Sequence, residues 1–257
     1  MPRYKDQALV LRRFPFGESS LVIHALSREG RRVHLVARGA HRAKSRYSGL
    51  LDLFDTLELE WSTRPGQTAG LGELRGGQLV TRRRSLTRDL MRYRAALAGL
   101  ELAGRAAREE AAEPGLFPVV EGLLNHLDDP ARRPEVELLA FDLQLLELLG
   151  LAPSLTLCAS CGGGAAEVKP GRAAFSAARG GRLCRKCAGE ARDDGARVGT
   201  LRTEVLTSAA LLKERTADER LALPPPPDGL LSSLFDFVDR FLEFHLETRL
   251  RTRPVTP

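Results

Sequence analysis

The 257-residue sequence predicts an α+β protein of two or three domains: a small β-barrel, then helices, with a cysteine-rich module among the helices. Three observations support this prediction. Short runs of alternating apolar residues fill the first 80 positions, and from Ser85 the apolar period changes to three or four residues. Two pairs of cysteines then interrupt the helical pattern between residues 158 and 187.

Five strands are expected in the first 80 residues, because apolar and β-branched residues alternate there between turn signals. The expected strands cover residues 7–14, 21–27, 31–40, 52–61 and 71–80. Five short strands in so few residues suit a closed barrel, and the OB-fold is the five-stranded barrel that most often binds single strands. An SH3-like barrel or a small sandwich also fits this pattern.

Helices are expected from Ser85 to about Arg108, then over residues 115–127, 134–149, 200–215 and 229–250, the last one capped by Asp228. Prolines 224–227 exclude helix just before that last segment. The helical domain is therefore expected to be discontinuous. We predict a barrel over 1–80, helices over 81–153, a zinc module over 154–195 and returning helices over 196–257.

The cysteines follow a metal-binding pattern, in which Cys158 and Cys161 form one CxxC pair and Cys184 and Cys187 form another. Each pair presents two thiolates on one tight turn, and two such turns complete a tetrahedron around Zn²⁺. Four cysteine ligands leave no open coordination position, so the predicted single Zn²⁺ is structural. The alternative is a redox pair, but no thioredoxin-like βαβ pattern surrounds either motif.

The charge is positive and unevenly distributed. The net charge of +6 favours acidic partners, of which nucleic acid is the commonest. Residues 1–80 hold 13 cations and 8 acids, whereas residues 95–150 hold 4 cations and 11 acids. Six arginines and one aspartate lie between them, in residues 82–94. The basic surface is therefore expected on the first third of the chain and on this junction.

The stretch from Arg31 to Tyr47 carries six cations and no acid. It begins as a half-buried strand and breaks at Gly39 into a basic loop, which can contact phosphates while a ring stacks on a base. The alternative is a solvated arginine-rich face. Tyr47 is the expected stacking ring. The predicted nucleic-acid contacts are Arg12, Arg13, Arg31, Arg32, Arg38, His41, Arg42, Lys44, Arg46 and Tyr47.

No active site is recognisable in the sequence, so we expect a protein that is not an enzyme. It contains no HExxH, GxxxxGK[ST] or GxSxG motif. His24, His34, His245 and Trp61 fit ordinary packing positions. No apolar run reaches the ~18 residues that span a bilayer, and the N-terminal segment lacks a signal-peptide pattern, so a cytoplasmic location without membrane partners is expected.

The segment from Gln7 to Trp61 resembles the N-terminal domain of the RecO family, most specifically in GESS at 17–20 and LVARGAHRAKSR at 35–46. The later order of helices, inserted CxxC–CxxC module and final helix also resembles that family. The resemblance implies an OB-fold that binds single- and double-stranded DNA. It also implies a recombination mediator that anneals strands and helps RecA displace single-stranded-DNA-binding protein in DNA repair, associated with the nucleoid.

The same resemblance implies three protein partners: RecR, the acidic C-terminal tail of the single-stranded-DNA-binding protein, and RecA indirectly. Candidate cations for the acidic tail are Arg82, Arg83, Arg84, Arg88, Arg92, Arg132 and Arg133. Two alternatives are a zinc-ribbon RNA-modifying protein and a ribosome-associated RNA-binding protein. The first needs a catalytic acid, base or cofactor loop, and the second would be expected to carry basic low-complexity tails; neither feature is recognisable in the sequence.

Overall fold

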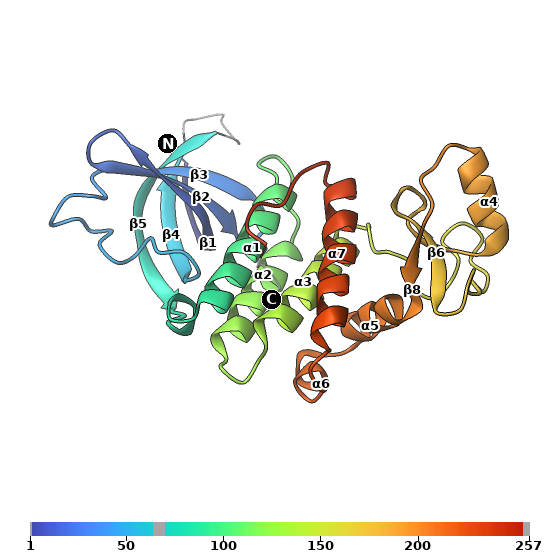
Figure 1. Ribbon diagram of the computed structural model, residues 1–257. Coiled ribbons are helices and arrows are strands. Elements are labelled where there is room, and N and C mark those ends of the chain that lie inside the picture. Colours follow the sequence, from blue (N-terminus) through green and yellow to red (C-terminus); the bar gives the residue numbers. More distant parts are fainter. Residues whose placement is uncertain (1, 64–69, 254–257) are drawn as a thin grey trace. The chain divides into compact units, whose positions relative to one another are not determined.

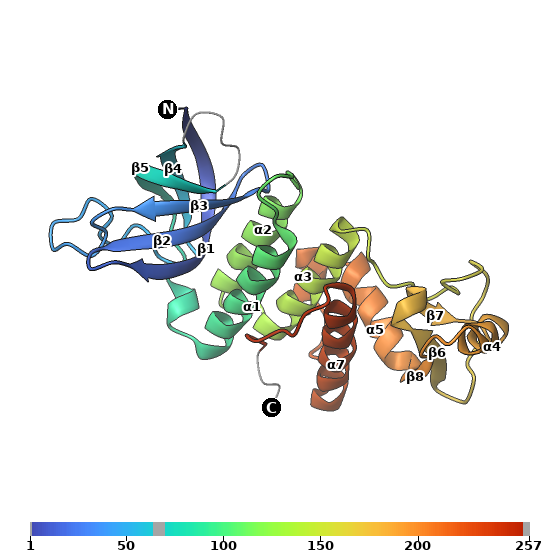
Figure 2. The same ribbon diagram turned by 90° about the horizontal axis from the view of Figure 1, so that it is seen from above.

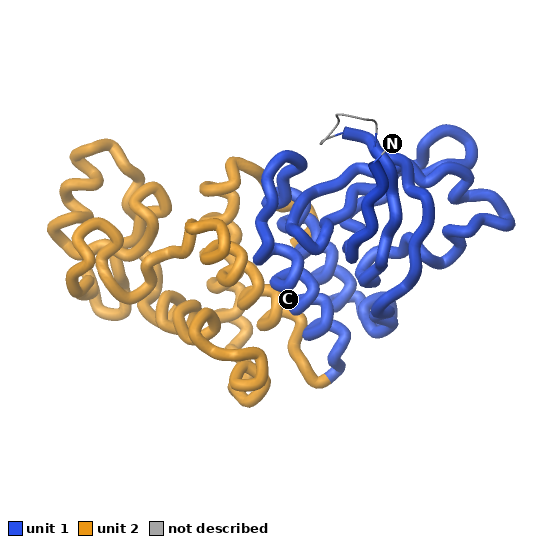
Figure 3. The backbone as a smooth tube through the Cα atoms, turned by 180° about the vertical axis from the view of Figure 1, so that it is seen from behind, with its two compact units in different colours: residues 1–130 blue, residues 131–257 orange. Residues whose placement is uncertain are grey.

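A computed structural model describes residues 2–63 and 70–253 of the chain. The chain forms two compact units, residues 1–130 and residues 131–257 (Figure 3). The finer division expected from the sequence, with boundaries after residues 80, 153 and 195, stays a prediction. Within the described ranges, no helix has both the length and the apolar character that crossing a membrane requires.

Unit 1 begins with a closed five-stranded barrel, which confirms the predicted OB-fold class (Figure 1). Its strands are β1 (Arg3–Phe16), β2 (Ser20–Ser27), β3 (Arg32–Ala37), β4 (Thr56–Ser62) and β5 (Leu71–Thr81). They close in the order β1-β2-β3-β5-β4, with only the β3–β5 pair parallel among these neighbours. Closure leaves no unpaired strand edge.

Two of the expected strands are shorter than predicted. The fourth begins at Thr56 rather than at residue 52, because Phe54 has a φ of +75°, which a strand cannot contain. The third ends at Ala37 rather than at residue 40, because the chain turns at Gly39, whose φ is +69°.

The barrel core is built from alternate residues of each strand, as the period of two requires. It includes Ile23, Leu35, Leu57 and Leu59, which are all buried. Side chains from the loop between β3 and β4 join the same core, and these are Tyr47, Leu50 and Leu51.

Two helices complete unit 1: α1 (Leu90–Ala106) and α2 (Leu116–Asp128). A short 3-10 turn (Ser85–Thr87) precedes α1, so that helix begins at Leu90 rather than at Ser85, with Asp89 accepting from the Arg92 amide at 2.9 Å. The turn before β3 packs tightly against the segment between these helices. A Cβ at Gly30 would lie 1.8 Å from the Glu113 carbonyl oxygen, so only glycine fits there.

Apart from the inserted module, the described residues of unit 2 form the helices α3 (Pro134–Leu148), α5 (Thr203–Glu214), α6 (Ala217–Leu221) and α7 (Asp228–His245). The expected module is inserted between α3 and α5 (Figure 2). It contains β6 (Arg172–Ser176), β7 (Gly181–Leu183), β8 (Gly199–Arg202), the 3-10 turn Ala177–Arg179 and α4 (Arg185–Asp193), with the sheet order β7-β6-β8.

Three helix boundaries in unit 2 differ from those expected. Residues 200–202 form a strand that pairs with β6 and are not part of the following helix. Asp228 is the first residue of α7 rather than its cap, because Pro227 occupies the cap position. That helix ends at His245 rather than at residue 250, and Glu247 soon after it has a φ of +48°.

Candidate nucleic-acid interface and metal centre

The basic loop, defined here as residues 38–46, leaves the barrel directly after β3. Successive turns shape it, with the Arg42 amide donating to the Gly39 carbonyl at 3.1 Å. Two hydrogen bonds tie it to the β1–β2 hairpin: the His41 amide donates to the Ser19 carbonyl at 2.8 Å and the Gly39 amide donates to Ser20 Oγ at 3.3 Å. The loop is therefore supported by the barrel.

The predicted cations of this loop are all exposed, as is His41. Arg42 and Lys44 form no ion pair within the described part of the chain. Arg38 approaches Glu73 at 3.5 Å, and Arg46 donates to the Arg75 carbonyl at 2.9 Å. These weakly engaged charges can meet phosphates at little cost, because little must be broken first.

The remaining predicted cations lie in different surroundings. Arg12 is exposed on β1, and Arg13 beside it pairs with Asp52 at 3.0 Å. Arg31 and Arg32 lie at the start of β3, away from the basic loop that follows its end. They donate to the Glu110 carbonyl at 2.9 Å and the Gly104 carbonyl at 3.0 Å. They therefore attach the barrel to the segment around the end of α1 and are not brought together with the basic loop.

Tyr47 cannot serve as the expected stacking ring. Its side chain is in the barrel core at 4% exposure, and its hydroxyl donates to the Leu74 carbonyl at 2.7 Å. Burial raises the pKa of Tyr47, an effect that the Arg46 charge opposes. A ring enclosed in this way has no open face for a base, so this prediction was wrong.

Two exposed rings that the sequence analysis missed lie next to the basic loop. Phe14 is 40% exposed and Phe16 is 51% exposed, both at the end of β1. The signal was the run Phe-Pro-Phe-Gly at a hairpin turn, where side chains have little chance of reaching a core.

Three arginines expected to hold an acidic partner instead have structural contacts within unit 1. Arg83 is buried and donates to the Phe54 carbonyl at 2.6 Å, and burial lowers its pKa against the opposing effect of nearby acids. Arg92 is buried and donates to the Leu127 carbonyl at 2.7 Å. Arg82 pairs with Asp55 at 3.1 Å. The burial of Arg83 and Arg92 corrects the expectation that these two hold an acidic partner, whereas the expectation for the exposed Arg82 stays a prediction.

Arg84 and Arg88 are exposed, as is Arg82. They line a cavity of about 630 Å³ in unit 1, together with Arg82 and the partly exposed Tyr93. Arginines outnumber the two acids of the lining, Asp52 and Asp55, and they lie beside the exposed Tyr93 ring, so the cavity suits an anionic group with an apolar neighbour.

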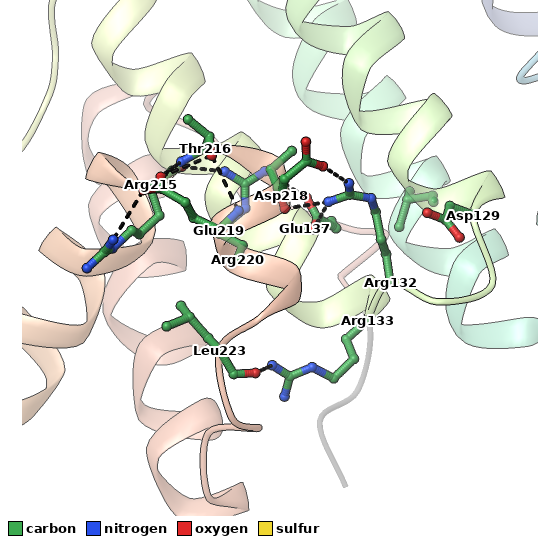
Figure 4. A network of polar contacts seen from close by, with 12 residues as sticks. Asp129, Arg132, Arg133, Glu137, Arg215, Thr216, Asp218, Glu219, Arg220 and Leu223 are labelled. Carbon is green, nitrogen blue, oxygen red and sulfur yellow. Dashed lines mark hydrogen bonds and ion pairs between the residues drawn. The ribbon is translucent and has the colours of Figure 1, made fainter.

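Arg132 and Arg133 also have structural roles, in unit 2 (Figure 4). Arg132 is buried and pairs with Asp218 at 2.7 Å and with Glu137 at 3.4 Å. Glu137 is buried too and accepts from Arg220 at 2.8 Å. Arg133 donates to carbonyls just before and within the proline run, at 3.3 and 3.4 Å. The expectation that Arg132 holds an acidic partner was therefore wrong, whereas the expectation for the half-buried Arg133 stays a prediction.

The four predicted metal ligands lie together in the inserted module. The sulfurs of Cys158, Cys161, Cys184 and Cys187 are all within 4.8 Å of one another. A tetrahedral Zn²⁺ with Zn–S bonds of about 2.3 Å needs sulfurs about 3.8 Å apart, so small side-chain adjustments would suit it. The donor set therefore fits a metal ion.

Local backbone structure explains how the two cysteine pairs meet. In the first turn the Gly162 amide donates to the Cys158 carbonyl at 2.8 Å, and Gly162 has a φ of +71°. In the second turn Cys184 precedes α4, and its sulfur accepts from the Cys187 amide at 3.5 Å. The Ala159 amide donates to the Arg182 carbonyl at 2.8 Å, which joins the two turns.

Hydrogen bonds within the module shift the pKa values of two of the four cysteines. Burial would raise the pKa of Cys158, but hydrogen bonds from backbone groups of the module lower it to about 6. Hydrogen bonding to Cys184, with burial, raises the pKa of Cys187 to about 12. A metal ion that binds the four thiolates would displace the thiol protons.

Comparison with known proteins places the sequence in context. The family model described as "Recombination protein O N terminal" matches residues 1–83, and that described as "Recombination protein O C terminal" matches residues 87–254. A protein of Myxococcus xanthus named DNA repair protein RecO is 32% identical over 252 residues, which cover 98% of this chain and 96% of that protein. A protein of the same name from Anaeromyxobacter sp. (strain K) is 35% identical over 270 residues, covering 98% and 95%.

Proposed function

The chain belongs to the RecO family of DNA repair proteins, and on that premise we propose that it acts as a recombination mediator. It binds single- and double-stranded DNA, anneals complementary strands and, with RecR, helps load RecA on DNA coated by single-stranded-DNA-binding protein. It does so without catalysing a covalent step, in the cytoplasm and at the nucleoid during repair.

The observation that carries this proposal is the exposed, weakly paired basic loop on the closed barrel. Annealing requires two phosphate backbones to approach each other, and their repulsion falls when cations replace condensed counterions. Arg42 and Lys44, which are exposed and without an ion-pair partner among the described residues, supply such cations. Arg12 and Arg38 extend the same charge.

We propose Zn²⁺ as the ion of the four-cysteine site, in a structural role. Thiolate ligands in two CxxC turns are typical of zinc, and four of them leave no coordination position for a substrate. The apolar cluster of the module consists mostly of small side chains, with Leu183 as its one large aliphatic member among the buried described residues. Such a small core needs the additional stability that a metal provides.

Two exposed arginines support a site for the acidic tail of single-stranded-DNA-binding protein. Arg84 and Arg88 would pair with its carboxylates, while the exposed ring of Tyr93 would contact an apolar side chain in the same cavity. RecR and, indirectly, RecA complete the proposed set of partners.

The decisive experiment is annealing of two complementary oligonucleotides, each first coated with single-stranded-DNA-binding protein. The mediator proposal predicts rapid annealing with the intact coating protein and slow annealing when its acidic tail is removed. DNA binding without annealing would overturn the proposal and return attention to an RNA-modifying or ribosome-associated protein.

A further inference from the structure

We infer that the β1–β2 hairpin carries the base-stacking surface of this protein, in Phe14 and Phe16, and that these two rings make it prefer unpaired strands to duplex. The inference rests on the proposed function, because it specifies how the same surface distinguishes its nucleic-acid substrates. The stacking role that the sequence analysis assigned to the buried Tyr47 is thereby reassigned to two rings that are exposed to solvent.

The hairpin presents both rings on the outside of the barrel. Side chains alternate along a strand, so Arg12, Phe14 and Phe16 share one face of β1, and all three are exposed. The turn at Gly17, with a φ of +61°, follows immediately. Two large exposed rings so close together on a soluble protein indicate a contact surface.

Phe14 is also the end of a row of rings that crosses three strands. It lies 5.0 Å from the His24 ring, which stacks on His34 with centroids 3.9 Å apart. Burial lowers the pKa of both histidines and the nearby charge of Arg32 acts in the same direction, whereas Glu109 acts in the opposite direction. The His24 ring on β2 thus supports Phe14 from one side, while the exposed part of Phe14 remains open to solvent.

Charge on the adjoining loop indicates which ligand covers these rings. The basic loop is bonded to the hairpin at Ser19 and Ser20, so the backbone of the loop lies beside the turn that follows Phe16. Within unit 1, hairpin and loop lie at the end of the barrel away from α1 and α2 in both Figure 1 and Figure 2. Glu18 adds one acid to the hairpin. Rings beside cations match a single strand, whose bases stack while its phosphates pair.

This arrangement should act differently on single strands and duplex. The cations meet phosphates in either form, whereas the bases of a duplex are stacked on one another and present no free face. The rings therefore add affinity only for unpaired bases. Removing both should weaken single-strand binding by about 10- to 100-fold, within the range measured for base–aromatic stacking, and should leave duplex binding nearly unchanged.

The test compares the full chain with the double variant Phe14→Ala/Phe16→Ala, measuring Kd for an oligodeoxythymidine and for a duplex of equal length by fluorescence anisotropy at one salt concentration. We expect the Kd for the single strand to rise by about 10- to 100-fold and the Kd for the duplex to change by less than about threefold. Equal loss on both ligands, or no loss on the single strand, would overturn the inference.

Three further variants make the result specific. Phe14→Tyr/Phe16→Tyr should retain single-strand affinity because it keeps both rings, whereas Phe14→Leu/Phe16→Leu should lose it although it keeps apolar area. Leu79→Ala/Val80→Ala, which removes an exposed apolar pair elsewhere on the barrel, should change neither Kd. Phe16→Ala alone repeats the test at the more exposed ring if the double variant is unstable. Full affinity of the leucine variant would overturn the stacking argument.

Failure of this inference is distinguishable from failure of the proposed function. A wild-type chain that binds neither ligand would overturn both. A wild-type chain that binds both ligands and anneals strands, with single-strand affinity unchanged in the alanine variants, would overturn the stacking inference alone.

Discussion

Removing two cations of the basic loop should change the salt dependence of DNA binding by a calculable amount. Each phosphate contact with a single strand contributes about 0.7 to the slope of log affinity against log salt. The substitutions Arg42→Ala and Lys44→Ala remove two exposed cations that have no ion-pair partner among the described residues. The slope should therefore become shallower by about 1.4. A fourfold rise in salt concentration should weaken DNA binding by both proteins, and the loss of affinity should be about sevenfold smaller for the variant than for the wild type.

The assay is fluorescence anisotropy with an oligodeoxythymidine across a series of salt concentrations. A matched control is Lys186→Ala/Arg240→Ala, which removes two cations from unit 2 whose side chains are 84% and 81% exposed. The control should keep the wild-type slope. An unchanged slope in the loop variant, or an equal change in the control, would refute the assignment, because the second result would mean that only net charge matters.

Three further predictions concern unit 2. Cys184→Ser should abolish binding of one Zn²⁺ per chain, measured by native mass spectrometry, and should expose residues 154–195 to proteolysis. Glu137→Gln removes the carboxylate that the buried Arg220 contacts at 2.8 Å, so the free energy of unfolding in urea should fall by about 3–5 kcal/mol. Burial raises the pKa of Asp142 to about 7, an effect that Arg253 opposes. Because the folded state then binds this proton more tightly than the unfolded state, the Asp142 contribution to stability falls as pH rises from about 4 to 7, and Asp142→Asn should flatten that decline.

Each of these has a result that would contradict it. Full zinc content and an intact module in the serine variant would show that Cys184 is not a ligand. If Glu137→Gln lowered the free energy of unfolding by less than about 1 kcal/mol, its ion pairs would be no stronger than those of surface groups. Glu135→Gln in the same helix is the control variant. An unaltered pH profile in the asparagine variant would mean that Asp142 does not titrate between pH 4 and 7.

Features fixed by local pattern were predictable from the sequence. Alternation of apolar residues located five strands of the barrel, and the spacing of two cysteine pairs located four sulfurs that the fold brings together. The error at the fourth strand arose at Phe54, whose positive φ interrupts an otherwise regular alternation.

Features that depend on distant partners were not predictable. Arg83 and Arg132 look like any other arginine in the sequence, and their burial follows from acceptors far along the chain, such as Phe54 and Asp218. Tyr47 follows exposed cations in the sequence, but its ring lies in the barrel core, where its hydroxyl donates to the Leu74 carbonyl. The local sequence therefore predicted the charge of the basic loop, but it did not predict which aromatic rings are exposed.

The central claim is that nucleic acid binds at the end of the barrel where hairpin and basic loop adjoin. Photo-cross-linking with an oligonucleotide that carries 5-iododeoxyuridine, followed by mass spectrometry of the peptides, tests this claim most directly. The account predicts cross-links within residues 14–20 and 38–46. Cross-links confined to residues 131–253 would contradict it.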